Sequence, residues 1–269
     1  MRLFDVHAHL THPDLLPDVD AVLTRAAAAG VGSIVVNGLN PADNEAVRAL
    51  AARHPIVRPA FGLYPVDAVL PEMLAEGVDY PRDGVDPVPW EAAVAWVADH
   101  VDECVAVGEI GLDGYWVPDT FWARQEAAFR ALVQLALDAD KPIIIHTRKR
   151  EQRAMEVLVE MGARRVDWHC FGGKVKLGQQ IAALPGQYLS IPANARKNEA
   201  FLKLVDTLPK DRILLETDCP YLSPERGTRN EPANVAHTVA VMAERWRWPE
   251  HDVAARLSEN FEALFGFAP

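Results

Sequence analysis

The chain has few cysteines and no long apolar segment. Its 269 residues contain three cysteines, Cys104, Cys170 and Cys219, and these form no CxxC pair. This argues against a disulfide framework and favours a reducing, cytoplasmic setting. No run is apolar for long enough to form a signal peptide or to span a membrane, so we expect no membrane association. No feature indicates an obligate protein partner.

Positive charge is also in short supply. The formal net charge is −11, which argues against a protein that coats long stretches of nucleic acid, because that task needs a basic face. An enzyme that grips one phosphate through metal ions stays open, because the ions bring their own positive charge.

The glycine-rich loops GxGxxG and GxxxxGK[ST], which hold nucleotides in open α/β sheets, are absent as well. Instead, eight short and mostly apolar runs alternate with amphipathic stretches, as in a parallel sheet covered on both faces. The expected strands are 3–7, 33–37, 57–63, 104–110, 142–146, 166–170, 187–191 and 212–218. The expected helices are 17–29, 41–53, 89–101, 119–139, 149–161, 174–184, 198–205, 232–246 and 250–264, and 64–88 is expected to be a loop.

Eight strand–helix units favour a single closed (β/α)8 barrel of the TIM type, with residues 1–269 forming one domain. An open doubly wound sheet is the alternative. No internal repeat and no linker divides the chain.

Imidazoles and carboxylates follow the predicted strands at their carboxyl ends. In a parallel barrel these ends line one open face, where active sites form. Charged groups buried there are costly unless they are paired, and coordination to a metal ion relieves the cost. The candidates are His7, His9, Glu109, His146, His169 and Asp218.

These six residues suit one or two divalent ions. His7 and His9 are two residues apart on a strand, so they point to the same face. Imidazole and carboxylate donors are compatible with zinc, nickel, manganese and magnesium. Taken singly, each residue has a structural explanation: an ion pair for Glu109, a turn cap for Asp218, and a buried core position for His146. Their shared position at one end of one barrel favours the metal site.

The other histidines and cysteines are expected to have structural roles. Five histidines lie in helices, at helix ends or in the first loop and are interpreted as solvated or capping residues: His12, His54, His100, His237 and His251. Cys170 and Cys219 each neighbour a proposed ligand, so strand alternation predicts that they point outward to the helices.

With these residues identified, the chain resembles the TatD family of metal-dependent deoxyribonucleases, a branch of the amidohydrolase barrels. The matching stretches run in order from end to end: FDVHAHL, VGEIGLD, PIIIHTR, WHCFGG, LLETDCPYLSP, RGTRNEP and SENFEALFG. The resemblance implies the metal ligands His7, His9, Glu109, His146, His169 and Asp218, with Glu109 bridging two ions.

The sequence departs from the family pattern at the rim of the site. Tyr64 stands in GLYP where the family often has the histidine of GxHP, Gly172 replaces the serine of HCFSG, and GLDY is interrupted as GLDGYW. None of these changes touches a proposed ligand. They bear on which substrate is held.

The resulting hypothesis is hydrolysis of a phosphodiester in DNA at a nucleic-acid end, by water activated at the metal site. Asp218 is the expected general base, Glu109 is its catalytic partner, and Arg148 and Tyr64 are the expected substrate contacts. The alternative is the same metal chemistry on a small phosphodiester, a lactone or another ester. A third interpretation is a non-catalytic barrel that binds a metal or a partner protein.

Overall fold

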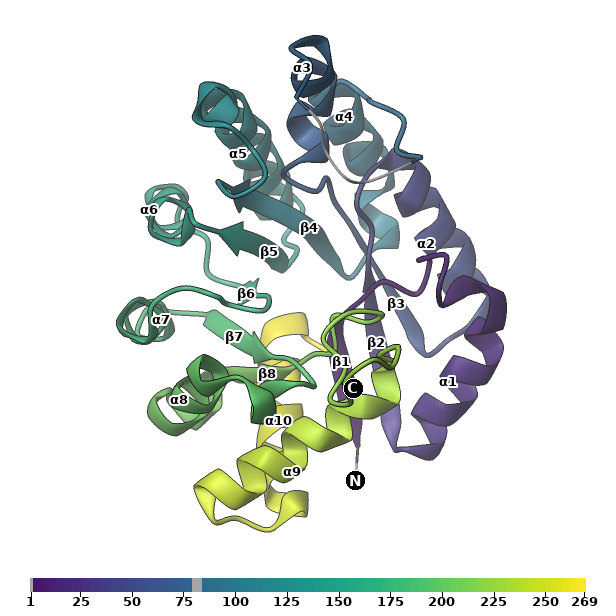
Figure 1. The fold of residues 1–269 in the computed structure, drawn as a ribbon, viewed down its shortest axis with the longest axis vertical. Helices are drawn as coiled ribbons and strands as arrows, with labels where there is room; N and C mark the ends of the chain where they lie inside the picture. Colours follow the sequence, from purple (N-terminus) through teal and green to yellow (C-terminus); the bar gives the residue numbers. More distant parts are fainter. Residues whose placement is uncertain (1, 79–83) are drawn as a thin grey trace.

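Eight parallel strands follow one another around the centre of the molecule in the order of the chain (Figure 1). The computed structural model describes residues 2–78 and 84–269. The strands are β1 (Leu3–Ala8), β2 (Val31–Asn37), β3 (Val57–Phe61), β4 (Ala106–Asp113), β5 (Ile143–Arg148), β6 (Val166–Trp168), β7 (Gln187–Ile191) and β8 (Ile213–Leu215).

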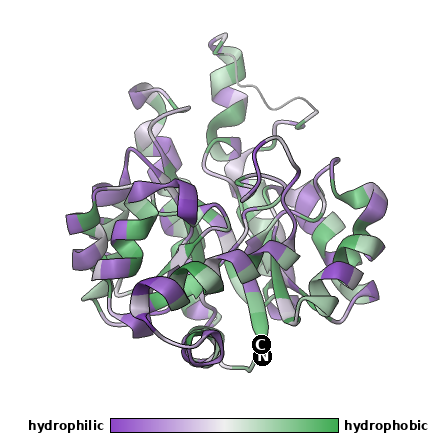
Figure 2. Ribbon diagram, turned by 60° about the horizontal axis from the view of Figure 1, so that its bottom comes forward, coloured by the Kyte–Doolittle hydropathy of each residue, from purple (hydrophilic) through white to green (hydrophobic). Residues whose placement is uncertain are grey.

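Helices surround the strands on the outside (Figure 1). They are α1 (Val19–Ala28), α2 (Pro41–Arg53), α3 (Leu70–Ala75), α4 (Trp90–His100), α5 (Trp122–Asp138), α6 (Glu151–Met161), α7 (Val175–Ala182), α8 (Glu199–Thr207), α9 (Val235–Trp246) and α10 (Glu250–Phe265). Hydrophilic and hydrophobic residues alternate along the helices, as Figure 2 shows, because one face of each packs on the strands. In the part of the chain that the structure describes, no helix combines the length and the apolar character that crossing a membrane requires.

The sheet curls into a nearly closed barrel. Each strand pairs in parallel with the next one in the chain, and the segment after β8 meets β1 through a bridge between Cys219 and Ala8. This order confirms the predicted (β/α)8 barrel. The open doubly wound alternative is wrong, because such a sheet reverses its strand order around a switch point.

Short-range signals explain where several helices begin and end. The Asn40 side chain accepts a hydrogen bond from the backbone amide of Asp43 and so caps α2, in which Pro41 occupies the first turn. Asn198 caps α8 in the same way through the amide of Ala200. At the other end, α10 stops at Gly266, whose φ of 82° suits a residue without a side chain.

The closing motif SENFEALFG holds α10 against β1 and against the start of β8. Asn260 donates to the backbone carbonyls of Lys210 and Ile213, which satisfies the chain where β8 starts. The ring of Phe261 packs against Phe4 of β1 at 4.7 Å between centroids. The motif therefore fixes the two strands that must meet for the barrel to close.

The predicted loop 64–88 contains structure that the prediction missed. It holds α3 and a 3-10 turn at Asp67–Val69, and residues 79–83 lie outside the described residues. Met73 of α3 and Val66 join Val117 and Phe121 in a small hydrophobic cluster of their own. A helix of six residues with a proline at its start is too short to produce a readable periodicity.

Three strands are shorter than predicted: β3, which ends at Phe61, and the two strands that precede His169 and Asp218. β6 ends at Trp168 and β8 at Leu215, so His169 and Asp218 lie in the turns that follow. In these turns Cys170 and Asp218 have positive φ angles of 44° and 56°, which are incompatible with a continuing strand. The proposed ligands are therefore carried by sharp turns at the barrel mouth.

Gly62, directly after β3, lies against β4 at the position of Glu109. A Cβ added at Gly62 would lie 2.5 Å from the carbonyl oxygen of Glu109 and 2.6 Å from its amide nitrogen. Both are backbone atoms, which cannot move aside as a flexible side chain can. The absence of a side chain at this position thus lets Glu109 sit where it does.

We predict that Gly62→Ala lowers the free energy of unfolding by about 1–3 kcal/mol, the usual cost of overpacking. Gly172→Ala is the matched control, because the nearest atom to its added Cβ is 4.0 Å away. Urea denaturation of both variants measures the difference. Equal midpoints for the two would show that β4 can shift freely here.

Candidate metal centre

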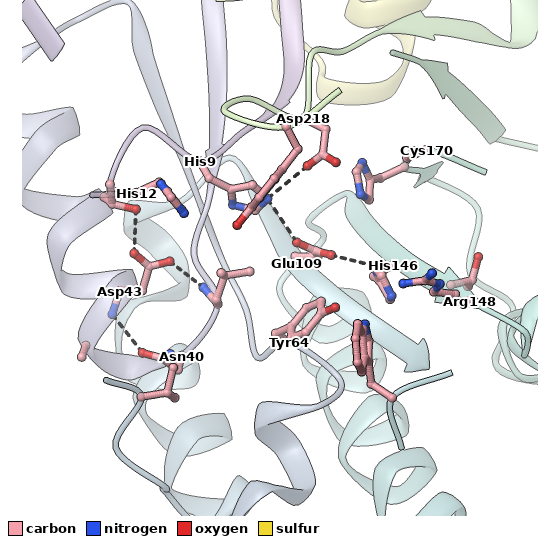
Figure 3. Close-up of a pocket in the computed structure, with 18 of the residues that line it drawn as sticks. His9, His12, Asn40, Asp43, Tyr64, Glu109, His146, Arg148, Cys170 and Asp218 are labelled. Carbon is pink, nitrogen blue, oxygen red and sulfur yellow. Dashed lines mark hydrogen bonds and ion pairs between the residues drawn. The ribbon is translucent and has the colours of Figure 1, made fainter. Parts of the chain in front are cut away.

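The predicted site residues meet at a cavity at the carboxyl ends of the strands. Its volume is about 1320 Å³, and five of the six candidate ligands line it: His9, Glu109, His146, His169 and Asp218. The sixth, His7, is fully buried and contacts the same carboxylates. Figure 3 shows Glu109 and Asp218 facing His9 across the cavity.

One half of the cluster joins β1 to β4 and to the turn after β8. His7 Nε2 and His9 Nε2 are 3.2 Å apart, which agrees with the prediction that both point to one face. Glu109 Oε2 lies 3.3 Å from the first and 3.6 Å from the second. Asp218 Oδ1 is 3.4 Å from His9 Nε2 and 4.0 Å from His7 Nε2.

The other half uses the second oxygen of the same glutamate. Glu109 Oε1 lies 3.1 Å from His146 Nδ1. Glu109, His146 and His169 each offer a donor atom within 4.8 Å of the other two, and so do His7, His9 and Glu109. Glu109 is thus shared by two donor groups, one on each carboxylate oxygen. This arrangement could hold two ions with a bridging carboxylate.

Two of the imidazoles, those of His9 and His146, have their outer nitrogens occupied by acceptors. His9 Nδ1 donates to the backbone carbonyl of Asn37 at 3.3 Å, and His146 Nε2 donates to Asp113 Oδ2 at 3.0 Å. In the neutral ring the inner nitrogen then carries a lone pair, and this lone pair faces the carboxylate of Glu109. A lone pair and a carboxylate repel one another unless a cation lies between them, so the donor set fits a divalent metal ion.

His169 is held in the same manner by a residue that the sequence analysis did not single out. Its Nδ1 lies 2.9 Å from Glu216 Oε2, and the same oxygen accepts a hydrogen bond from Ser190 at 2.7 Å. The His169 ring stacks on His7, with centroids 3.5 Å apart and an interplanar angle of 13°. Glu216 therefore orients the ring.

Sequence reasoning missed Asp113 and Glu216, although both lie within motifs that carry the resemblance. Each is a fully buried acid at or just beyond the end of an apolar strand. That position was the signal that identified Glu109, and it could have found these two residues as well.

The charges of the cluster are strongly coupled. Burial alone would raise the pKa of Glu109, but His7, His146 and His169 hold it well below its usual value. Burial would likewise lower the pKa of His169, yet Glu216 and Asp218 raise it to about 10. Carboxylates thus stay charged, and protons on the rings supply positive charge at the place where a metal ion would supply it.

His7 behaves differently from the other rings. Burial, followed by the neighbouring charge of His169, lowers its pKa to about 4. A ring that stays neutral at physiological pH has a free lone pair for a metal ion.

Asp5 connects the first strand of the barrel with the segment that follows the last strand, next to the site. Its carboxylate accepts from the amide of His7 at 3.1 Å and from the amide and hydroxyl of Thr217 at 3.0 and 2.5 Å. The Asp218 amide also donates to the His7 carbonyl at 2.9 Å. These contacts place the His7 and Asp218 side chains on the same side of the seam.

The motif RGTRNEP fastens the long segment after β8 to α1. Arg229 pairs with Asp18 at 2.7 Å, and Arg25 of α1 pairs with Glu231 at 2.6 Å. Asn230 is buried and donates to the backbone carbonyl of Thr217 at 2.8 Å. The motif thus positions the turn that carries Asp218.

The two predicted substrate contacts both line the cavity. Tyr64 packs edge-to-face on His146, with ring centroids 5.0 Å apart. Arg148, at the end of β5, is exposed, and its guanidinium carbon lies 3.7 Å from the ring centroid of Tyr115. Arg148 therefore faces the cavity on the same side as His146, as Figure 3 shows.

Of the two cysteines predicted to point outward to the helices, one does not. Cys170 lines the cavity, because the chain has already left β6 and turns at this residue with positive φ, so strand alternation no longer applies. Cys219 is buried as expected. His12 accepts from the amide of Asp14 in the first loop, as a capping residue does, and also lines the cavity.

Comparisons with known proteins agree with this geometry. The family described as TatD related DNase matches the chain over residues 4–266. An uncharacterised metal-dependent hydrolase of Bacillus subtilis, YabD, is 32% identical over 98% of both chains. The 3'-5' ssDNA/RNA exonuclease TatD of Enterobacter lignolyticus is 31% identical over 99% of this chain and all of the other.

Solved structures agree as well. The crystal structure of the TatD homologue YJJV from Escherichia coli superposes with a TM-score of 0.85 at 27% identity, covering 99% of this chain and 98% of that one. With matches of this extent in both sequence and structure, this chain belongs to the TatD family of metal-dependent hydrolases.

Proposed function

We propose that this protein hydrolyses phosphodiester bonds at the end of a DNA strand, using one or two divalent ions held by His7, His9, Glu109, His146, His169 and Asp218. The observation that carries the proposal is the sharing of Glu109 between two donor groups on its two oxygens. The Enterobacter lignolyticus relative, which is named as a 3'-5' ssDNA/RNA exonuclease and matches 99% of this chain, supports a nucleic-acid substrate.

The donors divide between the two oxygens of Glu109. His7, His9 and Asp218 lie on the Oε2 side, and His146 lies on the Oε1 side in a donor group with His169. When bound, divalent ions lower the pKa of water and polarise the phosphoryl oxygen. Zinc, magnesium, manganese and nickel all accept this mixture of nitrogen and oxygen donors.

Asp218 is the residue suited to act as general base. Its side chain is 16% exposed and lines the cavity, whereas that of Glu109 is 3% exposed. Burial would raise the pKa of Asp218, but His169 and His9 lower it, so the carboxylate is charged and can take a proton from a water molecule in the cavity. Glu109, enclosed by imidazoles, instead organises the ligands.

Two residues would hold the substrate beside these groups. The guanidinium of Arg148 can donate to phosphate oxygens at the rim, because five N–H groups fan out from its planar end. Tyr64 takes the place of the histidine often found in the family and presents a ring beside His146, which could stack on a base or cover the mouth.

A second candidate function is the same chemistry on a small phosphodiester, a lactone or another ester. The altered rim favours it, since Tyr64 and Gly172 both lie on the cavity wall and replace an imidazole and a hydroxyl of the family pattern. The third interpretation, a non-catalytic barrel, is disfavoured because the protein belongs to a family of hydrolases and retains all six donor side chains.

We predict that Glu109→Ala and Asp218→Ala each lower the rate of hydrolysis at least about 10²-fold. Glu109→Ala loses the carboxylate that the two donor groups share, and Asp218→Ala loses the general base. Turnover and thermal melting should be measured together. His251→Ala, at an exposed position in α10, is the control. Hydrolysis retained in both variants would remove the assignment of these residues.

Metal binding provides an independent test. Asp113→Asn keeps the Oδ1 acceptor but places an NH2 donor against His146 Nε2, so the ring loses the partner that orients it. We expect metal affinity to fall about 10–100-fold, measured by competition with a chelator. The exposed Asp119→Asn should bind metal as the parent does. Unchanged affinity in Asp113→Asn would show that His146 needs no such support.

The substrate is tested by a panel assayed with magnesium, manganese, zinc and nickel. End-labelled single-stranded DNA, RNA, bis(p-nitrophenyl) phosphate and a set of lactones should be compared, with elemental analysis of the purified protein. We expect DNA to be shortened stepwise from an end, with loss of activity in EDTA and recovery on adding metal. Turnover of lactones without any cleavage of DNA would favour the second candidate instead.

A further inference from the structure

Aromatic and basic side chains lie together beside the cavity, and the aromatic ones belong to the interrupted GLDGYW motif. Tyr115 and Trp116 are large side chains with 46% and 37% of their surface exposed, and their rings meet edge-to-face at 4.8 Å. Arg148 lies over Tyr115 at 3.7 Å, and the Lys149 ammonium lies 4.7 Å from the same ring. Exposed rings flanked by cations are the usual platform for unpaired nucleobases.

The platform is tied to the proposed metal centre by one carboxylate. Asp113 Oδ1 accepts from the backbone amides of Tyr115 and Trp116, both at 2.7 Å, while its Oδ2 accepts from His146. The turn that carries the two rings is therefore fixed relative to His146. Trp116 and Arg148 also line the cavity, so a ligand on this platform would lie at the cavity wall.

A second cavity of about 720 Å³ lies next to the first. The two share Lys149 and Glu151 in their walls, so they are neighbours. The second lies between the starts of α6 and α7, and five basic residues against two acidic ones line it. This local excess of positive charge stands out in a chain with a net charge of −11.

Several of these cations are available to a ligand. Within residues 2–78 and 84–269, Arg148, Lys149, Lys174 and Lys176 make no ion pair within 4 Å. By contrast, Arg153 on the same wall is engaged by Glu126 and Glu156. Cations without acidic partners are suited to phosphates.

We infer that Tyr115, Trp116 and Arg148 receive an unpaired base of a single-stranded nucleic acid, whose backbone continues along Lys149 into the second cavity toward Lys174 and Lys176. This rests on the proposed function and adds the residues along which the strand would lie; a single-stranded substrate is already named for the Enterobacter lignolyticus relative. A duplex is disfavoured, because its bases are paired and stacked and cannot present a face to the rings.

The test measures binding apart from cleavage. Protein in EDTA, which cannot turn over, is titrated into a fluorescently labelled 12-nucleotide oligo(dT), and anisotropy gives the Kd. Tyr115→Ala should raise the Kd about fivefold or more, the range found for loss of one base–aromatic stack. Trp248, which follows the carboxyl end of α9, is also 37% exposed. Trp248→Ala is therefore the matched control and should leave the Kd unchanged.

The lysines are tested by salt dependence. The double variant Lys174→Ala/Lys176→Ala should reduce the slope of log affinity against log salt by about 1.4, because each phosphate of a single strand that a lysine neutralises adds about 0.7 to that slope. The control is Lys203→Ala/Arg256→Ala, which removes the same charge from α8 and α10. Tyr115→Ala should keep the parent slope. All variants are checked by thermal melting.

The inference is overturned if the parent fails to bind the oligonucleotide, or if Tyr115→Ala and the double lysine variant match their controls. It is also overturned if a 12-base-pair duplex binds as tightly as the single strand and loses affinity equally in Tyr115→Ala. If the parent cleaves DNA but these variants have no effect, the inferred platform is wrong and the proposed hydrolysis stands. Binding through Tyr115 without cleavage of any phosphodiester would keep the platform and remove the proposed phosphodiester hydrolysis.

Discussion

The site depends on the seam where the first and last strands of the barrel meet. Asp5, fully buried, receives hydrogen bonds from the His7 amide and from both donors of Thr217, and the Asp218 amide reaches the His7 carbonyl. Burial raises the pKa of Asp5 to about 8, because charge is costly there. A polar group is kept in this place since it satisfies backbone groups that the short β8 leaves without strand partners.

The glutamate of β4 then organises what the seam brings together. Its two oxygens face different rings, and two of these rings are oriented by an acceptor on the far side: the Asn37 carbonyl for His9 and Asp113 for His146. Hydrogen bonds of this kind restrict the rotation of the rings, so little conformational freedom would be lost if an ion bound. The close approach of β3 at Gly62 adds to this rigidity.

Asp113 connects the metal centre with the rim. One of its oxygens orients His146 and the other holds the turn that carries Tyr115 and Trp116. The interruption of the family motif at this turn therefore lies beside the cavity and replaces none of the six candidate ligands. The proposed chemistry and the proposed substrate contacts would thus lie on adjacent parts of one strand end, as in other barrels of this fold, where loops after the strands vary the substrate.

The sequence by itself determined the barrel and the convergence of the six candidate ligands. Strand and helix periods are local properties, and parallel strands must bring their carboxyl ends to one face, so His7, Glu109 and His146 could be placed together from their positions alone. The family motifs agreed with the same residues.

The tertiary structure alone decided which groups surround them. Glu216 and Asp113 act through partners distant in the chain, and the aim of Cys170 depends on a turn of positive φ that no periodicity encodes. The helix at Leu70–Ala75 is stabilised by contacts with Val117 and Phe121 rather than by its own pattern. Contacts between distant residues, turn geometry and side-chain direction are set by packing, and for that reason they appear only when the chain is folded.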